Sequence, residues 1–207
     1  IRDRTYCVKA FDEIYSDSAN RYRLCCHANV NKSISHMTTD NTLPFEYFLS
    51  KEMEKIRDDM FDGKKIDGCE GCYNDEEING YSHRTKFNEE SDYNAGDVTK
   101  VSTKLKNFGS RCNLGCYMCR PYDSSTRRQE LKDAGLIDTW NNLGLDEFER
   151  EWVKNVSSKD VEIFNQNILD NIDKVRQIRI FGGEPVLLDR VWQFLDDICL
   201  LYTSDAA

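Results

Sequence analysis

Three closely spaced cysteines constrain this chain more than any other feature: Cys112, Cys116 and Cys119 lie within the stretch RCNLGCYMCRP. A structural zinc site needs four thiolate or imidazole ligands in a closed tetrahedron, usually as two pairs that are far apart in the sequence. Three thiolates on one loop instead suit one face of a cubane [4Fe–4S] cluster, because each binds one iron and the fourth iron stays open. Gly115 helps the backbone to curl between these ligands. The loop is therefore a candidate site for a cluster with an open iron.

The composition favours a soluble globular protein without a nucleic-acid or membrane partner. Of the 207 residues, 39% are hydrophobic, which is enough for one sizeable core or two small ones. The 37 acidic and 28 basic residues give a net charge of −9, which argues against binding a phosphate backbone. No apolar run suits a membrane span or a signal peptide, so we expect a cytoplasmic protein. In that reducing compartment, nine cysteines indicate metal or cluster ligation.

Residues 1–85 are predicted to form a first unit with two strands and one helix. The strands are expected at residues 4–9 and 21–27, on either side of the polar turn SDSAN. Apolar residues that recur at intervals of three and four predict one helix over residues 45–60, which begins near Pro44 and ends near Gly63. The polar, aperiodic residues 86–100 are interpreted as a linker.

Residues 101–198 show the pattern of a parallel α/β sheet with two βα repeats. A strand is expected around residues 104–108, directly before the cysteine loop, and another at 177–181, directly before GGEP. Helices are expected at residues 124–134, 145–152, 161–175 and 188–195. The last nine residues, 199–207 (CLLYTSDAA), resemble a translated sequencing adapter and are excluded from the fold prediction.

The CxxxCxxC motif after a strand, with the aromatic Tyr117 before its third cysteine, resembles the signature of radical S-adenosylmethionine (SAM) enzymes. The strand QIRIF followed by GGEP resembles that family's GGE motif, which holds the amino group of the methionine moiety. The resemblance implies that the three loop cysteines hold a [4Fe–4S] cluster. It also implies SAM binding by a set of five residues: Tyr117, Gly182, Gly183, Glu184 and Pro185.

Membership of this family implies a radical reaction. SAM chelates the open iron, and an electron supplied by a donor such as flavodoxin or ferredoxin cleaves SAM. The resulting 5′-deoxyadenosyl radical abstracts hydrogen from a substrate, so the cofactors carry the chemistry. The substrate is not identified by the resemblance; peptide modification or dehydrogenation is expected by analogy alone, with a peptide as one candidate substrate. Because the family's barrel needs more than two βα units, we expect this chain to be inactive by itself.

The first unit resembles the twitch or SPASM-like module that binds an auxiliary iron–sulfur cluster in many of these enzymes. The residues that carry this resemblance are Cys7, Cys25, Cys69 and Cys72, with Asn20 before Cys25. Asn20 replaces the family's glycine, which is tolerable because Asn visits the left-handed region. Ile78 replaces a further cysteine of the SPASM pattern, so the shorter twitch form fits better. The module also precedes the barrel, whereas the familiar order places it after.

The predicted fold class is therefore α/β, with a partial (β/α) radical SAM barrel of two βα units at residues 101–198. A small α+β twitch-like module at residues 1–85 precedes it, and residues 86–100 link the two.

Two alternatives stay open. Cys26 competes with Cys25, although strand alternation places Cys26 on the apolar face of Tyr22 and Leu24 and so favours Cys25 as the ligand. Zinc competes with an iron–sulfur cluster, because spacing does not separate them when all four ligands are thiolates. The rival function is a non-catalytic interaction module stabilised by either group. His27 and His36, which lack paired spacing, are interpreted as ordinary polar residues, and the acidic residues 146–151 as a solvated helix face.

Overall fold

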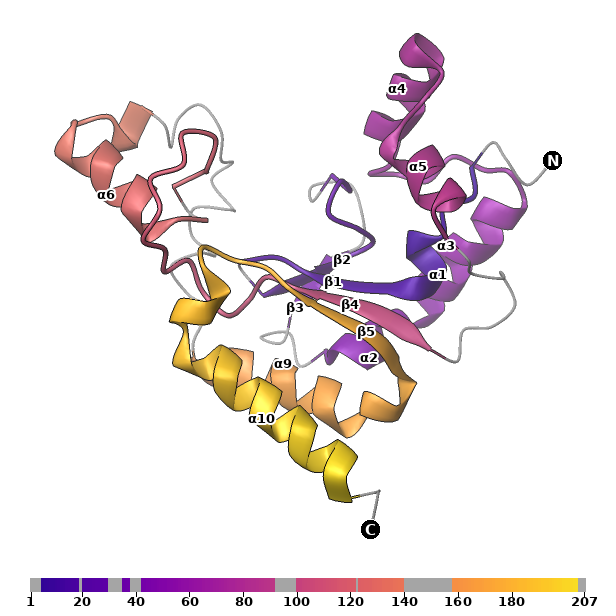
Figure 1. The fold of residues 1–207 in the computed structure, drawn as a ribbon. Helices are drawn as coiled ribbons and strands as arrows, with labels where there is room; N and C mark the ends of the chain where they lie inside the picture. The colour runs from indigo at the N-terminus through magenta and orange to yellow at the C-terminus, as the bar shows by residue number, and fades with distance from the viewer. Residues whose placement is uncertain are drawn as a thin grey trace. The chain divides into compact units, whose positions relative to one another are not determined.

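The structure is a computed structural model that describes residues 5–18, 20–29, 35–37, 42–91, 100–121, 123–139 and 158–204. The fold class is α/β, as predicted (Figure 1). The strands are β1 (Glu13–Ser16), β2 (Arg21–Arg23), β3 (Ser35–Met37), β4 (Val101–Leu105) and β5 (Val175–Ile180). The helices are α1 (Lys9–Asp12), α2 (Pro44–Phe48), α3 (Lys51–Phe61), α4 (Glu70–Asn79), α5 (His83–Glu89), α6 (Ser125–Asp133), α9 (Ser158–Asp170) and α10 (Asp189–Ser204), with 3₁₀ turns at Ile172–Lys174 and Pro185–Leu187.

The strands form one five-stranded sheet in the order β3-β2-β1-β4-β5 (Figure 1). β2 and β3 are antiparallel, with Arg21 opposite Met37 and Tyr22 opposite His36. Every residue of β1 and β4 is buried, as expected for strands with a neighbour on each side. The edge strand β5 buries Val175 and exposes several of its other residues.

The chain divides into two compact units that are discontinuous in sequence. Unit 1 contains residues 1–15, 21–104 and 171–179, and unit 2 contains residues 16–20, 105–170 and 180–207. The boundaries predicted at residues 85, 100 and 198 stay a prediction. Each unit has its own group of predicted site residues: unit 1 has the four N-terminal cysteines, and unit 2 has the three-cysteine loop and GGEP.

The predicted strand at residues 4–9 is wrong. Residues 5–8 are not a strand, Lys9 begins α1, and β1 follows from Glu13; residue 4 lies outside the described residues. The predicted strand at residues 21–27 is too long, because β2 ends at Arg23. Cys25 and Cys26 lie after the end of β2, so the alternation of side chains along a strand does not determine which of them is buried. Cys25 is buried and Cys26 is half-buried, the reverse of the burial that alternation predicted.

The helix predicted over residues 45–60 is two helices. The first ends at Phe48, and Ser50 caps the second, because its Oγ accepts a hydrogen bond of 3.2 Å from the Met53 amide. Leu49, which the periodicity places on the buried face, is 62% exposed at the break. Gly63 follows α3 with a φ of 77°, in agreement with its predicted place at the helix end.

The predicted linker begins inside a helix. α5 starts after the N-cap Ser82 and continues to Glu89, so residues 86–89 are helical. Residues 92–99 of the predicted linker lie outside the described part of the chain.

In the second half of the chain, the predicted strands and three of the predicted helices are confirmed in type, with shifted ends. α6 begins after the N-cap Ser124, and Gly135 follows its end with a φ of 68°. The helix predicted over 161–175 ends at Asp170, because the last apolar positions of the pattern belong to a 3₁₀ turn and to β5. The helix predicted at 145–152 lies outside the described residues. In unit 2, the rings of Phe108 and Phe194 pack with centroids 5.4 Å apart.

Candidate functional site

One small pocket of unit 1 is lined by all four predicted N-terminal ligands, Cys7, Cys25, Cys69 and Cys72. The other lining residues are Leu24, His27, Ala28, Gly68, Arg84 and Phe87. The pocket has a free volume of about 20 Å³, which is room for about one water-sized particle. Cys26 is not among its lining residues, so it is Cys25 that faces the other thiols.

Three short segments bring these thiols together. Cys7 precedes α1, Cys25 follows β2, and the pair Cys69–Cys72 spans the N-cap and first turn of α4. The Asn29 amide donates a hydrogen bond of 2.9 Å to the Gly68 carbonyl, which ties the turn after β2 to the start of the CxxC segment.

Burial dominates the electrostatics of these thiols. It raises the pKa of Cys25 and the pKa of Cys69 to about 12, and it raises the pKa of Cys7 well above its usual value of 9.0. Repulsion from neighbouring thiolates raises each of these pKa values further. Cys7, Cys25 and Cys69 are therefore protonated at neutral pH, and a metal that bound them would displace their protons.

The pocket wall includes His27, which the sequence analysis interpreted as an ordinary polar residue. The rings of His27 and His83 stack with centroids 3.6 Å apart and an interplanar angle of 18°. Burial, followed by the charge of His83, lowers the pKa of His27. His27 is therefore neutral near pH 7. His36 lies in β3, and its side chain is outside the described residues.

The loop with Cys112, Cys116 and Cys119 lies in unit 2 and is open to solvent. The Cys119 amide donates a hydrogen bond of 3.0 Å to the Cys116 carbonyl, which closes a tight turn. Tyr117 and Met118, at the tip of that turn, are 89% and 90% exposed. Desolvation, followed by the charges of the other two loop cysteines, raises the pKa of Cys119. The three thiols thus lie within electrostatic reach of one another.

The start of α6 holds this loop at its first cysteine. The Cys112 amide donates to the Ser125 Oγ at 3.0 Å, and the Thr126 Oγ1 donates to the Cys112 carbonyl at 2.5 Å. The Arg127 guanidinium lies 5.4 Å from the centre of the Tyr117 ring, a cation–π distance. One helix terminus therefore fixes the backbone of the first predicted ligand and contacts the exposed aromatic residue.

The GGEP segment lies against the residues that lead into the loop. The Glu184 amide donates a hydrogen bond of 2.8 Å to the Arg111 carbonyl, one residue before Cys112. A Cβ atom at Gly183 would lie 2.5 Å from that carbonyl oxygen and 2.7 Å from the Ser110 carbonyl oxygen. Only glycine allows this approach. The two predicted motifs, far apart in the sequence, are therefore adjacent in unit 2.

The other GGEP residues shape the same contact. Gly182 has a φ of 155°, and a Cβ there would lie 2.7 Å from the Gly109 carbonyl oxygen. Pro185 begins a 3₁₀ turn, and the half-buried Glu184 precedes it without capping it through its side chain. A capping role therefore does not account for the carboxylate of Glu184.

Neither group of cysteines is arranged as a finished ligand shell. Within the part of the chain that the structure describes, no three His, Cys, Asp or Glu side chains are positioned to hold a metal ion. Both groups nevertheless fit a metal by their donor chemistry, because several thiolates together select zinc or iron–sulfur clusters.

Buried charges lie beside the four-thiol pocket and carried no signal in the sequence. Lys9 and Lys104 approach the same oxygen of the fully buried Glu13, at 3.0 and 3.3 Å. Both ammonium groups also lie over the ring of Phe87, at 5.0 and 5.3 Å from its centre. Phe87 lines the pocket, and so does the buried Arg84.

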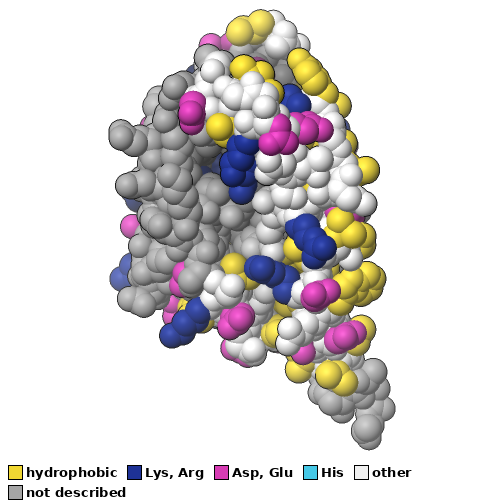
Figure 2. Space-filling model, turned by 90° about the vertical axis from the view of Figure 1, so that its left-hand side faces the viewer, with side chains coloured by type: hydrophobic (Ala, Val, Ile, Leu, Met, Phe, Trp, Pro, Cys, Tyr) yellow, Lys and Arg dark blue, Asp and Glu magenta, His cyan; other side chains and the backbone are white. Residues whose placement is uncertain are grey.

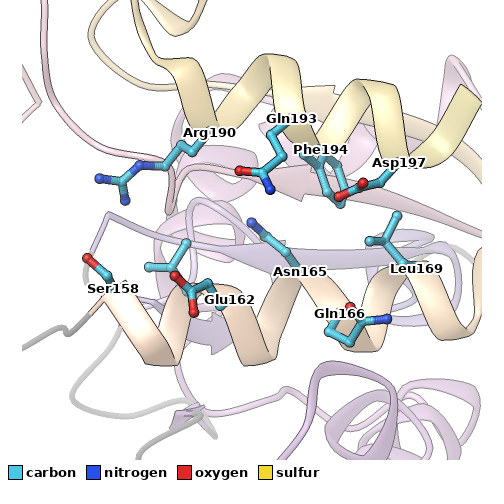
Figure 3. Close-up of a pocket in the computed structure, with 10 residues that line it drawn as sticks. Ser158, Glu162, Asn165, Gln166, Leu169, Arg190, Gln193, Phe194 and Asp197 are labelled. Atoms are coloured by element: carbon cyan, nitrogen blue, oxygen red, sulfur yellow. The ribbon is translucent and has the colours of Figure 1, made fainter.

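A larger groove of about 450 Å³ runs between α9 and α10 in unit 2 (Figure 3). Its lining is mostly polar and comprises Ser158, Val161, Glu162, Asn165, Gln166, Leu169, Arg190, Gln193, Phe194 and Asp197. Figure 3 shows that Asn165 of α9 and Gln193 of α10 point toward one another. The sequence predicted these residues as helix faces and contains no chemical motif among them.

No protein-family model matches this chain, and neither a curated protein nor a solved structure matches it. Within the described residues, no helix combines the length and the apolar character needed to cross a membrane.

Proposed function

We propose that this chain carries the cofactor-binding part of a radical SAM enzyme, in which Cys112, Cys116 and Cys119 hold a [4Fe–4S] cluster and GGEP binds SAM. When bound, the cluster supplies the electron that cleaves SAM to the radical that abstracts hydrogen. The observation that supports this proposal is the contact between the two motifs. The Glu184 amide lies 2.8 Å from the Arg111 carbonyl, so a ligand held by GGEP sits beside the cysteine loop.

The chain's own residues orient and hold the cofactors. α6 fixes the backbone at Cys112 through Ser125 and Thr126, which keeps the first thiol in place while the rest of the loop stays open. Glu184 offers a carboxylate to an ammonium group, and Gly183 lets the backbone reach the loop. The exposed Tyr117 is proposed to cover the bound nucleoside with its ring.

The four-thiol pocket is proposed as an auxiliary iron–sulfur site of the twitch type. Its four thiolates close a ligand shell, which suits electron transfer, structure or substrate anchoring. Asn20, which stands in place of the family's glycine, has a φ of 58°. Glycine is the residue that most often adopts this left-handed conformation. Asn20 adopts it too, so the replacement of glycine by Asn is compatible with the backbone conformation that the family pattern needs.

A second candidate function is a non-catalytic module with zinc in the four-thiol pocket. The free volume of about 20 Å³ favours it, because one ion needs less room than a cubane cluster.

Anaerobic reconstitution with iron and sulfide separates the two functions. We expect iron and sulfide for up to two clusters in the wild-type chain, and we expect Cys112→Ala/Cys116→Ala/Cys119→Ala to remove one cluster and leave the other. Cys26→Ala is the matched control, since Cys26 lies outside both groups, and it should keep the full content. Zinc as the only bound metal, or full iron content in the triple variant, would contradict the radical SAM proposal.

A further inference from the structure

We infer that Arg84 clamps the four-thiol pocket and balances its negative charge when a metal is bound, an inference that rests on the metal site proposed at Cys7, Cys25, Cys69 and Cys72. Arg84 lines this pocket and is 3% exposed. It lies in α5, outside every motif that the sequence revealed.

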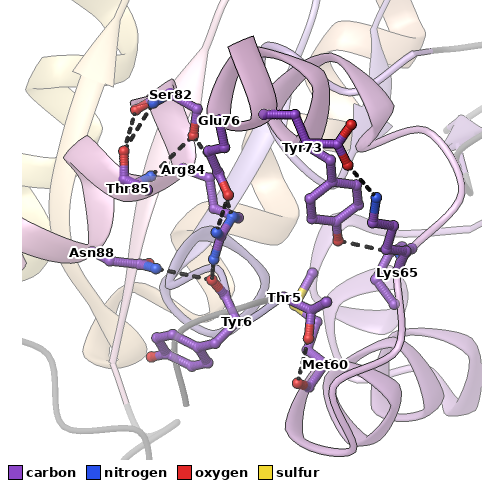
Figure 4. Close-up of polar contacts among 12 residues, drawn as sticks. Thr5, Tyr6, Met60, Lys65, Tyr73, Glu76, Ser82, Arg84, Thr85 and Asn88 are labelled. Carbon is purple, nitrogen blue, oxygen red and sulfur yellow. Dashed lines mark hydrogen bonds and ion pairs between the residues drawn. The ribbon is translucent and has the colours of Figure 1, made fainter. Parts of the chain in front are cut away.

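The guanidinium of Arg84 joins the segments that carry the thiols (Figure 4). Its Nη1 donates to the Tyr6 carbonyl at 2.6 Å, one residue before Cys7. Its Nε donates to Glu76 at 2.9 Å, and its Nη2 pairs with the other oxygen of the same carboxylate. Glu76 belongs to α4, whose first turn contains Cys72. A single fork of donors therefore fixes the first cysteine segment to the CxxC helix.

A second side chain of α5 supports the same arrangement. Asn88 donates to the Tyr6 carbonyl at 2.8 Å and accepts from the Val8 amide at 2.8 Å, so it holds the backbone on both sides of Cys7. Figure 4 shows Arg84 and Asn88 reaching the Tyr6 carbonyl together. The position of Cys7 thus depends on α5, although the two are far apart in the sequence.

The charge of Arg84 complements that of a loaded site. Four thiolates outweigh the positive charge of a zinc ion or of a cluster core, and a buried excess charge needs a partner. Among the described residues that line the pocket, Arg84 is the one permanent cation. Burial alone lowers the pKa of Arg84, but the hydrogen bonds that Arg84 donates to Glu76 outweigh that effect and keep the guanidinium charged. Glu76 lies behind Arg84 and is not part of the pocket lining.

Cobalt(II) titration of the reduced chain tests the clamp, with thiolate-to-cobalt absorption as the readout. The background is Cys112→Ala/Cys116→Ala/Cys119→Ala, so that only the four-thiol pocket reports. We expect Arg84→Gln to weaken Co²⁺ binding roughly 10- to 100-fold, the usual cost of removing an outer-shell partner. Arg84→Lys should recover part of this loss, because it keeps the charge without the fork.

Arg57→Gln is the matched control. Arg57 also binds backbone carbonyls, those of Ala10 and Phe48 at 2.8 and 2.6 Å, but it does not line the pocket. It should leave Co²⁺ affinity unchanged. Equal affinity in Arg84→Gln and Arg57→Gln would overturn the inference about Arg84 alone. Absence of Co²⁺ binding in the background chain would overturn the proposed metal site itself.

The reduction potential of the reconstituted auxiliary cluster separates charge balance from packing. Loss of the cation in Arg84→Gln should lower the potential, whereas loss of the anion in Glu76→Gln should raise it. A purely structural role predicts no such opposite pair of shifts, and shifts in the same direction would overturn the charge-balancing role. If Arg84→Gln does not fold, Glu76→Gln alone tests the charge-balancing role, because it should still raise the potential, whereas Arg84→Lys, which keeps the cation, should leave the potential near the wild-type value.

Discussion

At the residue scale, Gly183 allows a close backbone approach between GGEP and the residues that precede the cysteine loop. Gly183 lets the GGEP backbone reach the carbonyls of Ser110 and Arg111, where a Cβ would lie within 2.7 Å of both oxygens. Both contacted atoms belong to the backbone, so a side chain there cannot simply be pushed aside. The sequence identified this glycine by its motif, but it did not reveal which atoms it approaches.

Gly183→Ala should therefore lower the free energy of unfolding by roughly 1 to 3 kcal/mol, the usual cost of overpacking, and should reduce iron uptake by the loop. Urea unfolding and iron analysis measure these effects. Gly71→Ala is the control for stability alone, because a Cβ at that helical position meets nothing within 4 Å. Equal stability of the two variants, or wild-type iron content in Gly183→Ala, would contradict the close approach.

The two groups of cysteines should differ in reactivity before any metal binds. Cys116 is exposed, whereas Cys25 is buried and burial raises its pKa to about 12. Because the thiolate is the nucleophile, we expect iodoacetamide to label Cys116 well before Cys25 in the metal-free chain at neutral pH. Peptide mass spectrometry against time follows the order. Labelling of both cysteines at the same rate would show that the four-thiol pocket is open.

At the scale of elements, the start of α6 positions the three-cysteine loop. Ser124 caps α6, accepting from the Arg127 amide at 3.3 Å, and its Oγ also lies 3.5 Å from the Leu114 carbonyl of the cysteine loop. Ser50 caps α3 in the same way, without touching a cysteine segment. The Ser50 cap also explains why the apolar pattern over residues 45–60 corresponds to two helices. Hydrophobic periodicity alone does not reveal that a side chain within the pattern caps a new helix.

Ser124→Ala and Ser50→Ala should each lower the free energy of unfolding by about 1 kcal/mol. Only Ser124→Ala should also weaken iron binding by the three-cysteine loop, because only Ser124 reaches the loop backbone. Thermal unfolding and iron analysis of the two variants make the comparison. Equal iron content in both would mean that the α6 cap does not position the loop.

The ion pair between α4 and α5 should make the stability of the metal-free chain depend on pH. Partial burial raises the pKa of Glu76, but hydrogen bonds from Arg84 and Ser82 outweigh it, so the net pKa falls below the usual 4.5. A lowered pKa gives stability that is complete above about pH 4.5 and is lost as the pH falls through the folded-state value.

Glu76→Gln should therefore reduce the loss of stability on acidification, by an amount on the order of 1 kcal/mol. Urea unfolding between neutral and acidic pH measures it. Glu77→Gln is the control, because its pair with Lys65 is exposed at both side chains and should contribute little. Identical pH profiles for Glu76→Gln and the wild-type chain would contradict the assigned role of the pair.

At the scale of the molecule, the sequence marked the candidate ligands but not the residues that surround them. CxxxCxxC, CxxC and GGEP are local motifs, so the spacing of a few residues identifies them. Arg84 and Asn88 were not predicted, because their roles depend on contacts with Tyr6 from α5. The strand at residues 4–9 was wrong because a short apolar run does not separate strand from helix.

On the face shown in Figure 2, Lys and Arg side chains lie interspersed with Asp and Glu side chains. The expectation that the chain binds no nucleic acid, drawn from its net charge of −9, stays a prediction.

Electron paramagnetic resonance of the reconstituted, reduced chain, recorded with and without SAM, tests the central claim most directly. An iron with a free coordination position should bind SAM, so the account predicts a changed spectrum in the wild-type chain and no change in Cys112→Ala/Cys116→Ala/Cys119→Ala. A wild-type spectrum that SAM leaves unaltered, or a chain that holds only zinc, would contradict it.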